Sequence, residues 1–303
     1  MEEEDWKDEM SGATLLVGHS DKIFAVAWSP DGRYLASGAR DKTVRIWNVT
    51  TGVCEYIYRG HTQCLLAVAW SPDSTSIASG DTSGVVQVWR ALTGTNILAY
   101  SGHTRFVRGV AWSPDGNYIA SGGDYGDSTV QVWHATSGKT IYIHRDQYRN
   151  FSVKWSPDGT RLATANFDGT AQVFDAFTGR NVLRYEEHSG PVYAIAWSPD
   201  GQAIVSAGYD TTLRLWNALS AKTLCTLVGH NAPVKTIAWS PANADIASGS
   251  DDTTIRLWHS STASHFFTYT GHSAWVRSLD WSPDGSSIAS VSDHVIHVWQ
   301  AAY

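Results

Sequence analysis

The chain has 303 residues, of which 43% are hydrophobic and 17% are charged, a balance typical of soluble globular proteins rather than of disordered chains. Its net charge is −7, and residues 2–9 alone contribute six acids and one base, which leaves −2 for the rest. A body this close to neutral lacks the lysine and arginine excess that phosphate neutralisation needs, which argues against nucleic acid as a partner.

Cysteine content and hydropathy indicate the compartment. Cys54, Cys64 and Cys225 show no metal-type spacing and cannot form a disulfide framework, which favours a reducing environment, and we interpret them as small buried hydrophobes. No apolar run reaches the eighteen residues of a membrane helix, and the acidic N-terminus does not resemble a signal peptide. The sequence therefore predicts a cytoplasmic protein without a membrane partner.

Residues 1–13 come first and form a predicted acidic, disordered leader, because its like charges repel one another and its apolar content is low. Its one tryptophan, Trp6, is a candidate for docking on the folded body. Residues 14–303 follow as a single predicted domain.

A repeat organises that domain. The tripeptide Trp-Ser-Pro begins at seven places, spaced 42, 42, 43, 42, 42 and 42 residues apart: Trp28, Trp70, Trp112, Trp155, Trp197, Trp239 and Trp281. A second tryptophan closes six of the units, and Phe174 replaces it in the fourth. Self-similarity at a fixed period is the signature of a repeat architecture.

The first unit predicts four short strands at residues 25–28, 34–37, 43–47 and 54–58. The tetrapeptide Ser29-Pro30-Asp31-Gly32 is suited to a tight turn between the first two strands, since Pro favours the second turn position and Gly a left-handed one. The third strand is rich in β-branched residues, and no segment of the unit has helical periodicity.

These landmarks resemble the WD-repeat β-propeller family: a Gly-His pair precedes the first strand, a serine lies in the second, an aspartate in the next turn and a tryptophan in the third. The resemblance covers residues 14–303. It implies an all-β fold, a closed seven-bladed β-propeller of four-stranded antiparallel blades. Radial packing of blades buries both faces of each sheet and leaves only short edges.

Ring closure requires the two ends of the domain to meet. The last blade lacks a fourth strand of its own, while residues 14–17 occupy the place that fourth strands have elsewhere, just before a Gly-His pair. We expect the N-terminal strand to pair beside residues 295–299 and complete the last blade, as the resemblance implies.

The resemblance also assigns a structural role to a buried His-Ser-Asp-Trp chain in most blades. The residues concerned are His19, Ser37, Asp41 and Trp47; His103, Ser121, Asp127 and Trp133; His188, Ser206, Asp210 and Trp216; His230, Ser248, Asp252 and Trp258; and His272, Ser290, Asp293 and Trp299. The second unit has Ser83 in the Asp position, and the fourth has Asp146 and Phe174 in the His and Trp positions. We expect these two blades to be the weaker ones.

Histidine, serine and aspartate together invite a comparison with a nucleophilic triad. An active site needs one constellation in one cleft, whereas this set recurs around the ring, so the sequence predicts scaffolding and no enzyme. His294 and His297 are the best candidate metal pair, but three residues apart on a strand they point to opposite faces. Neither a metal nor another cofactor is therefore predicted.

Function is expected from side chains that the repeat does not require. In the resembled family, the face where the first strands begin commonly binds peptides, and the predicted peptide-binding residues are Phe24, Phe106, Arg108, Phe151, Tyr193, Tyr209, Lys235, Trp275 and Arg277. Trp275 belongs to neither repeated tryptophan position. Exposed aromatics and arginines dominate binding hot spots, so these residues indicate a protein or peptide partner. The cations among them favour an acidic partner.

The sequence therefore predicts a non-catalytic scaffold or sensor module that binds proteins and is itself monomeric unless it belongs to a larger assembly. Two alternatives remain open at this stage. One is a multivalent binder of small molecules or glycans that uses pockets between blades, and the other is a hydrolase.

Overall fold

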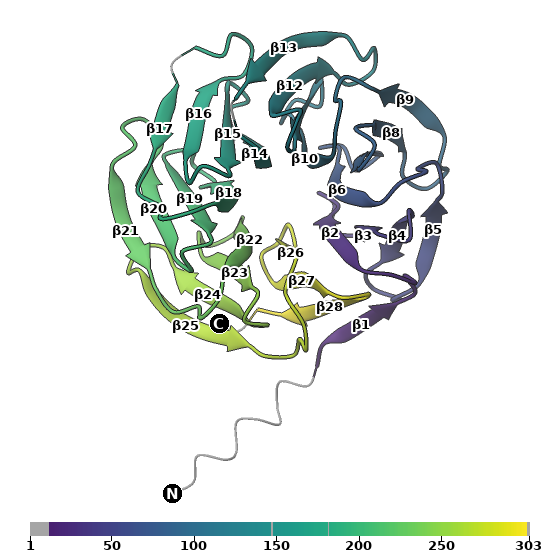
Figure 1. Cartoon of the computed structure of the whole chain (residues 1–303). Helices are drawn as coiled ribbons and strands as arrows, with labels where there is room; N and C mark the ends of the chain where they lie inside the picture. The colour runs from purple at the N-terminus through teal and green to yellow at the C-terminus, as the bar shows by residue number, and fades with distance from the viewer. Residues whose placement is uncertain (1–11, 147, 181, 302–303) are drawn as a thin grey trace, which may run out of the picture.

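The computed structural model describes residues 12–146, 148–180 and 182–301. Within these ranges the chain forms twenty-eight strands and no helix, in seven four-stranded antiparallel sheets arranged around a central axis (Figure 1). The predicted all-β, seven-bladed propeller is thus confirmed. The predicted leader falls almost wholly on residues 1–11, which lie outside the described residues together with Trp6.

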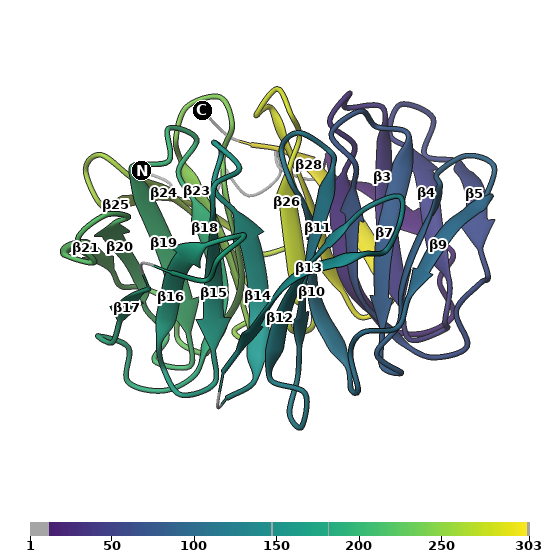
Figure 2. The same ribbon diagram turned by 90° about the horizontal axis from the view of Figure 1, so that it is seen from above.

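Each blade contributes one strand to each of four concentric positions (Figures 1 and 2). The innermost strands are β2 (Ile23–Trp28), β6 (Leu65–Trp70), β10 (Val107–Trp112), β14 (Asn150–Trp155), β18 (Val192–Trp197), β22 (Val234–Trp239) and β26 (Ser278–Trp281). The second strands are β3 (Tyr34–Ala39), β7 (Ser76–Asp81), β11 (Tyr118–Gly123), β15 (Arg161–Asn166), β19 (Ala203–Gly208), β23 (Ile246–Ser250) and β27 (Ser287–Ser292).

The third and outermost strands complete the blades. The third strands are β4 (Val44–Asn48), β8 (Val86–Arg90), β12 (Thr129–His134), β16 (Ala171–Asp175), β20 (Leu213–Asn217), β24 (Ile255–His259) and β28 (Val295–Gln300). The outermost strands are β5 (Cys54–Tyr58), β9 (Asn96–Tyr100), β13 (Thr140–Arg145), β17 (Leu183–Tyr185), β21 (Thr223–Leu227), β25 (Ser264–Tyr269) and β1 (Thr14–Val17). We number the blades 1–7 from β2, so that blade 7 contains β26, β27, β28 and β1.

The Ser-Pro-Asp-Gly turns form as the sequence predicts. In the first, the Ser29 hydroxyl donates to the Asp31 carboxylate at 2.5 Å and accepts from the Tyr34 backbone N–H at 2.9 Å. Gly32 has a φ of 73°, the left-handed conformation that glycine adopts without steric cost. These hydrogen bonds hold the turn that links the first two strands of the blade.

The core lies between the blades. The buried hydrophobic side chains of the described residues group into seven clusters, each shared by two neighbouring blades, including one that joins blades 7 and 1. The Trp-Ser-Pro tryptophans reinforce several of these interfaces: the Trp70 indole N–H, for example, donates to the Ala27 carbonyl of the preceding blade at 3.1 Å. Each sheet is therefore stabilised by both of its neighbours.

The N-terminal strand closes the ring. Strand β1 pairs antiparallel with β28, with Thr14 opposite Val298 and Val17 opposite Val295 (Figure 1). Leu16 is buried in the cluster that joins blades 7 and 1. The closure expected from the sequence is confirmed, because β1 supplies the fourth strand of the last blade.

A carboxylate lines the central channel where the innermost strands of blades 7 and 1 meet. Five innermost strands have alanine immediately before the Trp-Ser-Pro tryptophan, whereas blade 4 has Lys154 and blade 7 has Asp280. The Asp280 carboxylate accepts the backbone N–H of Trp28 at 2.8 Å and that of Trp281 at 3.0 Å. Burial nevertheless raises the pKa of Asp280 to about 6, because loss of hydration disfavours the ionised form more than these bonds and Lys154 favour it.

We predict that deletion of residues 1–17 destabilises the protein strongly, because it removes β1 and exposes the β28 edge. The melting temperature should fall by about 10 °C or more, the shift that several kcal/mol produce in a domain of this size, with aggregation on heating. Deletion of residues 1–11 alone is the matched control and should leave the melting curve unchanged. Equal melting of the two deletions would contradict the role of β1.

We also predict a pH effect at the seam between blades 7 and 1. The folded-state pKa of Asp280 lies above the ordinary 3.8, so its stabilising contribution is present below about pH 4 and is lost as the pH rises through about 6. Relative to wild type, Asp280→Ala should therefore gain about 2–3 kcal/mol of unfolding free energy between pH 4 and pH 7. Urea unfolding at several pH values measures this, and a constant difference between the two proteins would refute it.

Candidate peptide-binding face

The blades are held internally by hydrogen-bonded His-Ser-Asp-Trp chains. In blade 1, the Trp47 indole N–H donates to the Ser37 hydroxyl at 2.8 Å, Nε2 of His19 lies 2.8 Å from the same hydroxyl, and Nδ1 of His19 lies 2.8 Å from the Asp41 carboxylate. The same contacts occur in the third, fifth and sixth blades. Ser37 and His19 are buried, which places the hydroxyl out of reach of a substrate.

These chains also fix the charge of their carboxylates. Burial alone would raise the pKa of Asp41, but hydrogen bonds from His19 and Thr43 outweigh it and hold that pKa well below its ordinary value. The pKa values of Asp127, Asp210 and Asp252 are lowered by equivalent hydrogen bonds. The carboxylates therefore remain ionised and serve as fixed acceptors.

Two blades complete the chain from an unexpected position. In blade 2, Ser83 occupies the expected aspartate position, but Asp81 takes its role: Nδ1 of His61 lies 2.7 Å from the Asp81 carboxylate. In blade 7, the assignment of Asp293 is wrong: Nδ1 of His272 lies 2.9 Å from the Ser292 hydroxyl, and Asp293 is half-exposed near Lys22. The reason is strand geometry, since a residue two positions after the strand serine points to the same face and reaches the same histidine.

Blade 4 differs as expected. The His144 ring stacks on Phe174 with centroids 4.2 Å apart, and the Gln172 side-chain amide donates to Asp146 at 2.7 Å. Burial lowers the pKa of His144, so an uncharged imidazole packs against the ring. Blade 4 thus replaces part of the hydrogen-bonded chain with aromatic packing.

The remaining polar candidates are accommodated locally. His297 accepts or donates a hydrogen bond with the Tyr269 hydroxyl at 2.8 Å, and the described residues contain no group of three or more potential metal ligands. Cys54, Cys64 and Cys225 are unpaired and only partly buried, whereas we expected them to be buried. Burial raises the pKa of the Cys64 thiol to about 11. In the part of the chain that the structure describes, no helix is long and apolar enough to span a bilayer.

The unrepeated side chains gather on one face, where the innermost strands begin around a central channel of about 770 Å³. We call this the entry face and define it by Phe24, Phe106, Arg108, Phe151, Tyr193, Tyr209, Lys235, Trp275 and Arg277. Six of these residues line the channel. Phe106, Tyr209 and Trp275 are respectively 40%, 57% and 52% exposed, so this face presents large aromatic side chains to solvent.

Two groups of contacting cations and aromatics make up most of this face. In the first, the Arg108 guanidinium lies 5.5 Å from the Phe151 ring centroid, Phe151 contacts Tyr193 edge to face at 5.1 Å, and the Lys235 ammonium lies 3.6 Å from the Tyr193 centroid. In the second, Arg277 lies 5.2 Å from the Phe24 centroid and 5.4 Å from that of Trp275. The cations are therefore pre-ordered by aromatic faces.

Lys235 also pairs with an acid at the rim of the channel. Its ammonium lies 3.4 Å from the Asp251 carboxylate. Burial lowers the pKa of Lys235 and raises that of Asp251, although each partner opposes the shift of the other. The rim of the channel is thus partly desolvated, and contacts made there are stronger than in water.

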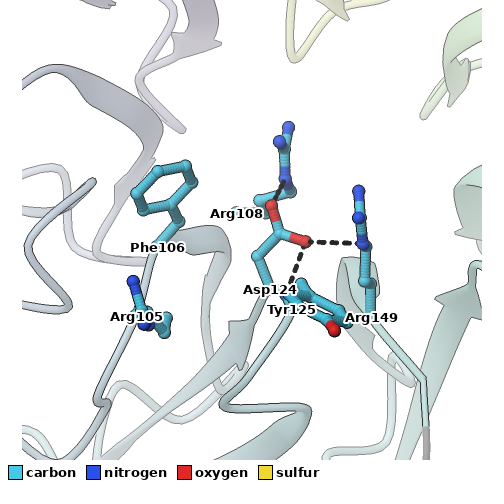
Figure 3. Close-up of a pocket in the computed structure, with 6 residues that line it drawn as sticks. All are labelled: Arg105, Phe106, Arg108, Asp124, Tyr125 and Arg149. Atoms are coloured by element: carbon cyan, nitrogen blue, oxygen red, sulfur yellow. Dashed lines mark hydrogen bonds and ion pairs between the residues drawn. The ribbon is translucent and has the colours of Figure 1, made fainter.

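A separate pocket adjoins the first group. It is a hollow of about 370 Å³ lined by Arg105, Phe106, Arg108, Asp124, Tyr125 and Arg149 (Figure 3). Its centre is Asp124, whose side chain is 6% exposed and which contacts both Arg108 and Arg149. The sequence of the third unit has an insertion of two residues in this turn, but Asp124, Arg105 and Arg149 were not among the predicted site residues. The insertion was the available signal.

Comparison with known proteins agrees with this geometry. Residues 46–217 match the family model described as the IFT122 first β-propeller, and residues 12–48, 221–259 and 264–300 match the WD domain, G-beta repeat. The chain belongs to the WD-repeat β-propeller family.

Curated relatives match part of the chain. The F-box-like/WD repeat-containing protein TBL1X of Mus musculus is 31% identical over 185 residues, which cover 60% of this chain and 29% of that protein. TBL1Y of Homo sapiens is 30% identical over 183 residues, or 59% of this chain and 28% of that protein. The ribosome biogenesis protein BOP1 homolog of Drosophila virilis is 51% identical over 37 residues, 12% of this chain and 5% of that protein. The chain thus spans less than a third of the length of these relatives.

We predict that the WD-repeat hydrogen-bonded chain contributes to stability and has no other required role. Ser248→Ala should lower the unfolding free energy by about 2–4 kcal/mol, because the buried indole N–H of Trp258 and Nε2 of His230 both lose their hydrogen-bond partner. Ser261→Ala, at an exposed serine of the same blade, is the control and should change little. Chemical denaturation measures both, and equal stability of the two variants would contradict the assignment.

Proposed function

We propose that this WD-repeat propeller is a non-catalytic protein-interaction module that binds an extended peptide segment of a partner across its entry face. The observation that carries the proposal is the concentration of exposed aromatics and ordered cations there, at positions where the repeat imposes no residue type. Large aromatic side chains and arginines supply most of the binding energy in protein interfaces. A binding surface accounts for their exposure, whereas fold stability does not.

The burial of the serines and histidines supports the non-catalytic part of the proposal. Ser37, Ser79, Ser121, Ser206, Ser248 and Ser290 are all fully buried, each within the scaffold of its own blade. A nucleophile must reach its substrate, and its general base must be free to transfer a proton. The ionised, fixed aspartates and the recurrence of the set favour a structural role instead.

The proposal extends to the setting of the module. The three unpaired cysteines support a reducing, cytoplasmic compartment, and the closed ring, which pairs its own terminal strands, supports a monomeric unit. We regard binding of small molecules in repeated pockets between blades as the alternative, which would give several equivalent sites per chain.

A selection from a phage-displayed library of unmodified peptides tests the main proposal. Peptides enriched on the full chain should bind with one equivalent per propeller, and Trp275→Ala or Tyr209→Ala should weaken binding about tenfold or more, the effect of losing one aromatic anchor. Leu224→Ala is the control, since Leu224 is an equally exposed apolar residue on outermost strand β21.

The outcome separates the alternatives by stoichiometry and by location. Calorimetry that gives several equivalents per chain would favour repeated pockets over the entry face. Affinities that are the same for wild type, Trp275→Ala and Tyr209→Ala would refute the proposed site.

A further inference from the structure

The pocket beside β10 adjoins a turn with an insertion that no other blade has. Five residues lie between Ser121 and Asp127 in blade 3, whereas three lie between Ser37 and Asp41 in blade 1. Asp124 comes just before the extra residues, and its backbone N–H donates to the Phe106 carbonyl at 2.9 Å, as the equivalent Arg40 and Tyr209 donate to Lys22 and Pro191. The Asp124 carbonyl accepts the N–H groups of Asp127 and Ser128 at 3.0 Å. The carboxylate is therefore held in a hydrogen-bonded turn.

The Asp124 carboxylate contacts the Nε atoms of two arginines. The Nε of Arg108 donates to one carboxylate oxygen at 2.5 Å, and the Nε of Arg149 lies 3.6 Å from the other. Figure 3 shows the terminal nitrogens of both guanidinium groups directed away from the carboxylate. Among the described residues these terminal nitrogens have no hydrogen-bond acceptor, so both forks remain available to a ligand. Charge-assisted bonds from such forks are the strongest that side chains make to oxyanions.

Aromatic rings fix the orientation of the same two arginines. The Arg149 guanidinium lies 5.1 Å from the Tyr125 ring centroid and 4.9 Å from that of Phe167, and Arg108 packs against Phe151. Ordering a free arginine on binding costs rotamer entropy, and stacking removes much of that cost in advance. The pocket is thus preorganised in the absence of a ligand.

The charge of the pocket matches a dianion. Arg105, Arg108 and Arg149 contribute three positive charges and Asp124 one negative charge, a net charge of +2. A phosphate monoester carries close to two negative charges at neutral pH and offers three terminal oxygens, enough for two separate forks and a third cation. A single carboxylate has only two oxygens and leaves one positive charge uncompensated. Phe106 at the edge of the hollow provides an apolar surface for the neighbouring residue of a peptide.

We propose that this pocket binds the phosphate group of a phosphorylated serine or threonine in the partner peptide, with Arg108 and Arg149 as the phosphate ligands and Asp124 as the residue that positions them. The inference rests on the proposed function and specifies the chemistry recognised at one end of the entry face. Phosphorylation of the partner would then switch its binding to the propeller on.

Binding of degenerate heptapeptide pools to the immobilised full chain tests this. The pools differ only at the central residue, which is phosphoserine, serine or glutamate. Wild type should retain the phosphoserine pool about tenfold more strongly than the other two, the difference expected for paired charge-assisted hydrogen bonds. Arg108→Gln and Arg149→Gln should abolish this preference, and Arg149→Lys should restore little of it because a lysine has no fork. Arg40→Gln, on the same face in blade 1, should leave the preference intact.

The partly exposed arginines can be replaced without disturbing the core, and a melting curve for each variant verifies this. Asp124→Ala is the test of positioning: it makes the pocket more positive and should nevertheless weaken phosphoserine binding, whereas simple charge attraction would strengthen it. Equal retention of the three pools by wild type, or a phosphoserine preference that survives Arg149→Gln, would overturn the proposal.

Two further results distinguish the sources of failure. Retention of vesicles that contain phosphatidylinositol bisphosphate with higher affinity than the phosphoserine pool would overturn the peptide assignment in favour of a lipid headgroup. Phage-selected unmodified peptides that depend on Trp275, combined with equal retention of the three heptapeptide pools, would leave the proposed function standing while this inference fails.

Discussion

The structure depends on a single constraint, the closure of the ring. Each blade is a sheet with apolar side chains on both faces, and neither face can be buried except against another blade. An open arc of seven blades would leave two apolar faces in water, so the last and first blades must meet. Strand β1 holds the ring closed, because it precedes blade 1 in the sequence but pairs with β28 of blade 7.

Closure also divides the side chains into two kinds. Residues that recur in phase, such as the blade histidines, serve the interior of their own sheet and are satisfied there. Residues that do not recur have no such structural role. On the entry face they are aromatic and cationic side chains in contact with one another. In blade 3 such residues place a buried aspartate in contact with two arginines. Individual function in a repeat protein is expected at such departures.

The sequence was sufficient for the architecture because its signals are redundant. The tryptophans of seven units fall in one register, so an irregular unit such as blade 4 could still be placed, and the pairing of β1 with β28 followed from the missing fourth strand. Counting positions along the repeat gave the wrong hydrogen-bond partner for two histidines, because the partner is decided by the face of the strand to which a side chain points. Asp81 and Ser292 replace the residues expected to bond their histidines, because alternate residues of a strand share a face. The role of Asp124 could not be predicted either, since it requires Arg149, which comes from the next blade and is brought near only by ring packing.

The antiparallel pairing of β1 with β28 has a mechanical consequence. Thr14 lies opposite Val298, near the end of β28, so the two ends of the domain leave from the same end of the strand pair. A pulling force between segments attached at these ends would load the hydrogen bonds one at a time, as in a zipper, rather than all together in shear. The seam that stabilises the ring against heat is therefore its weak point under tension.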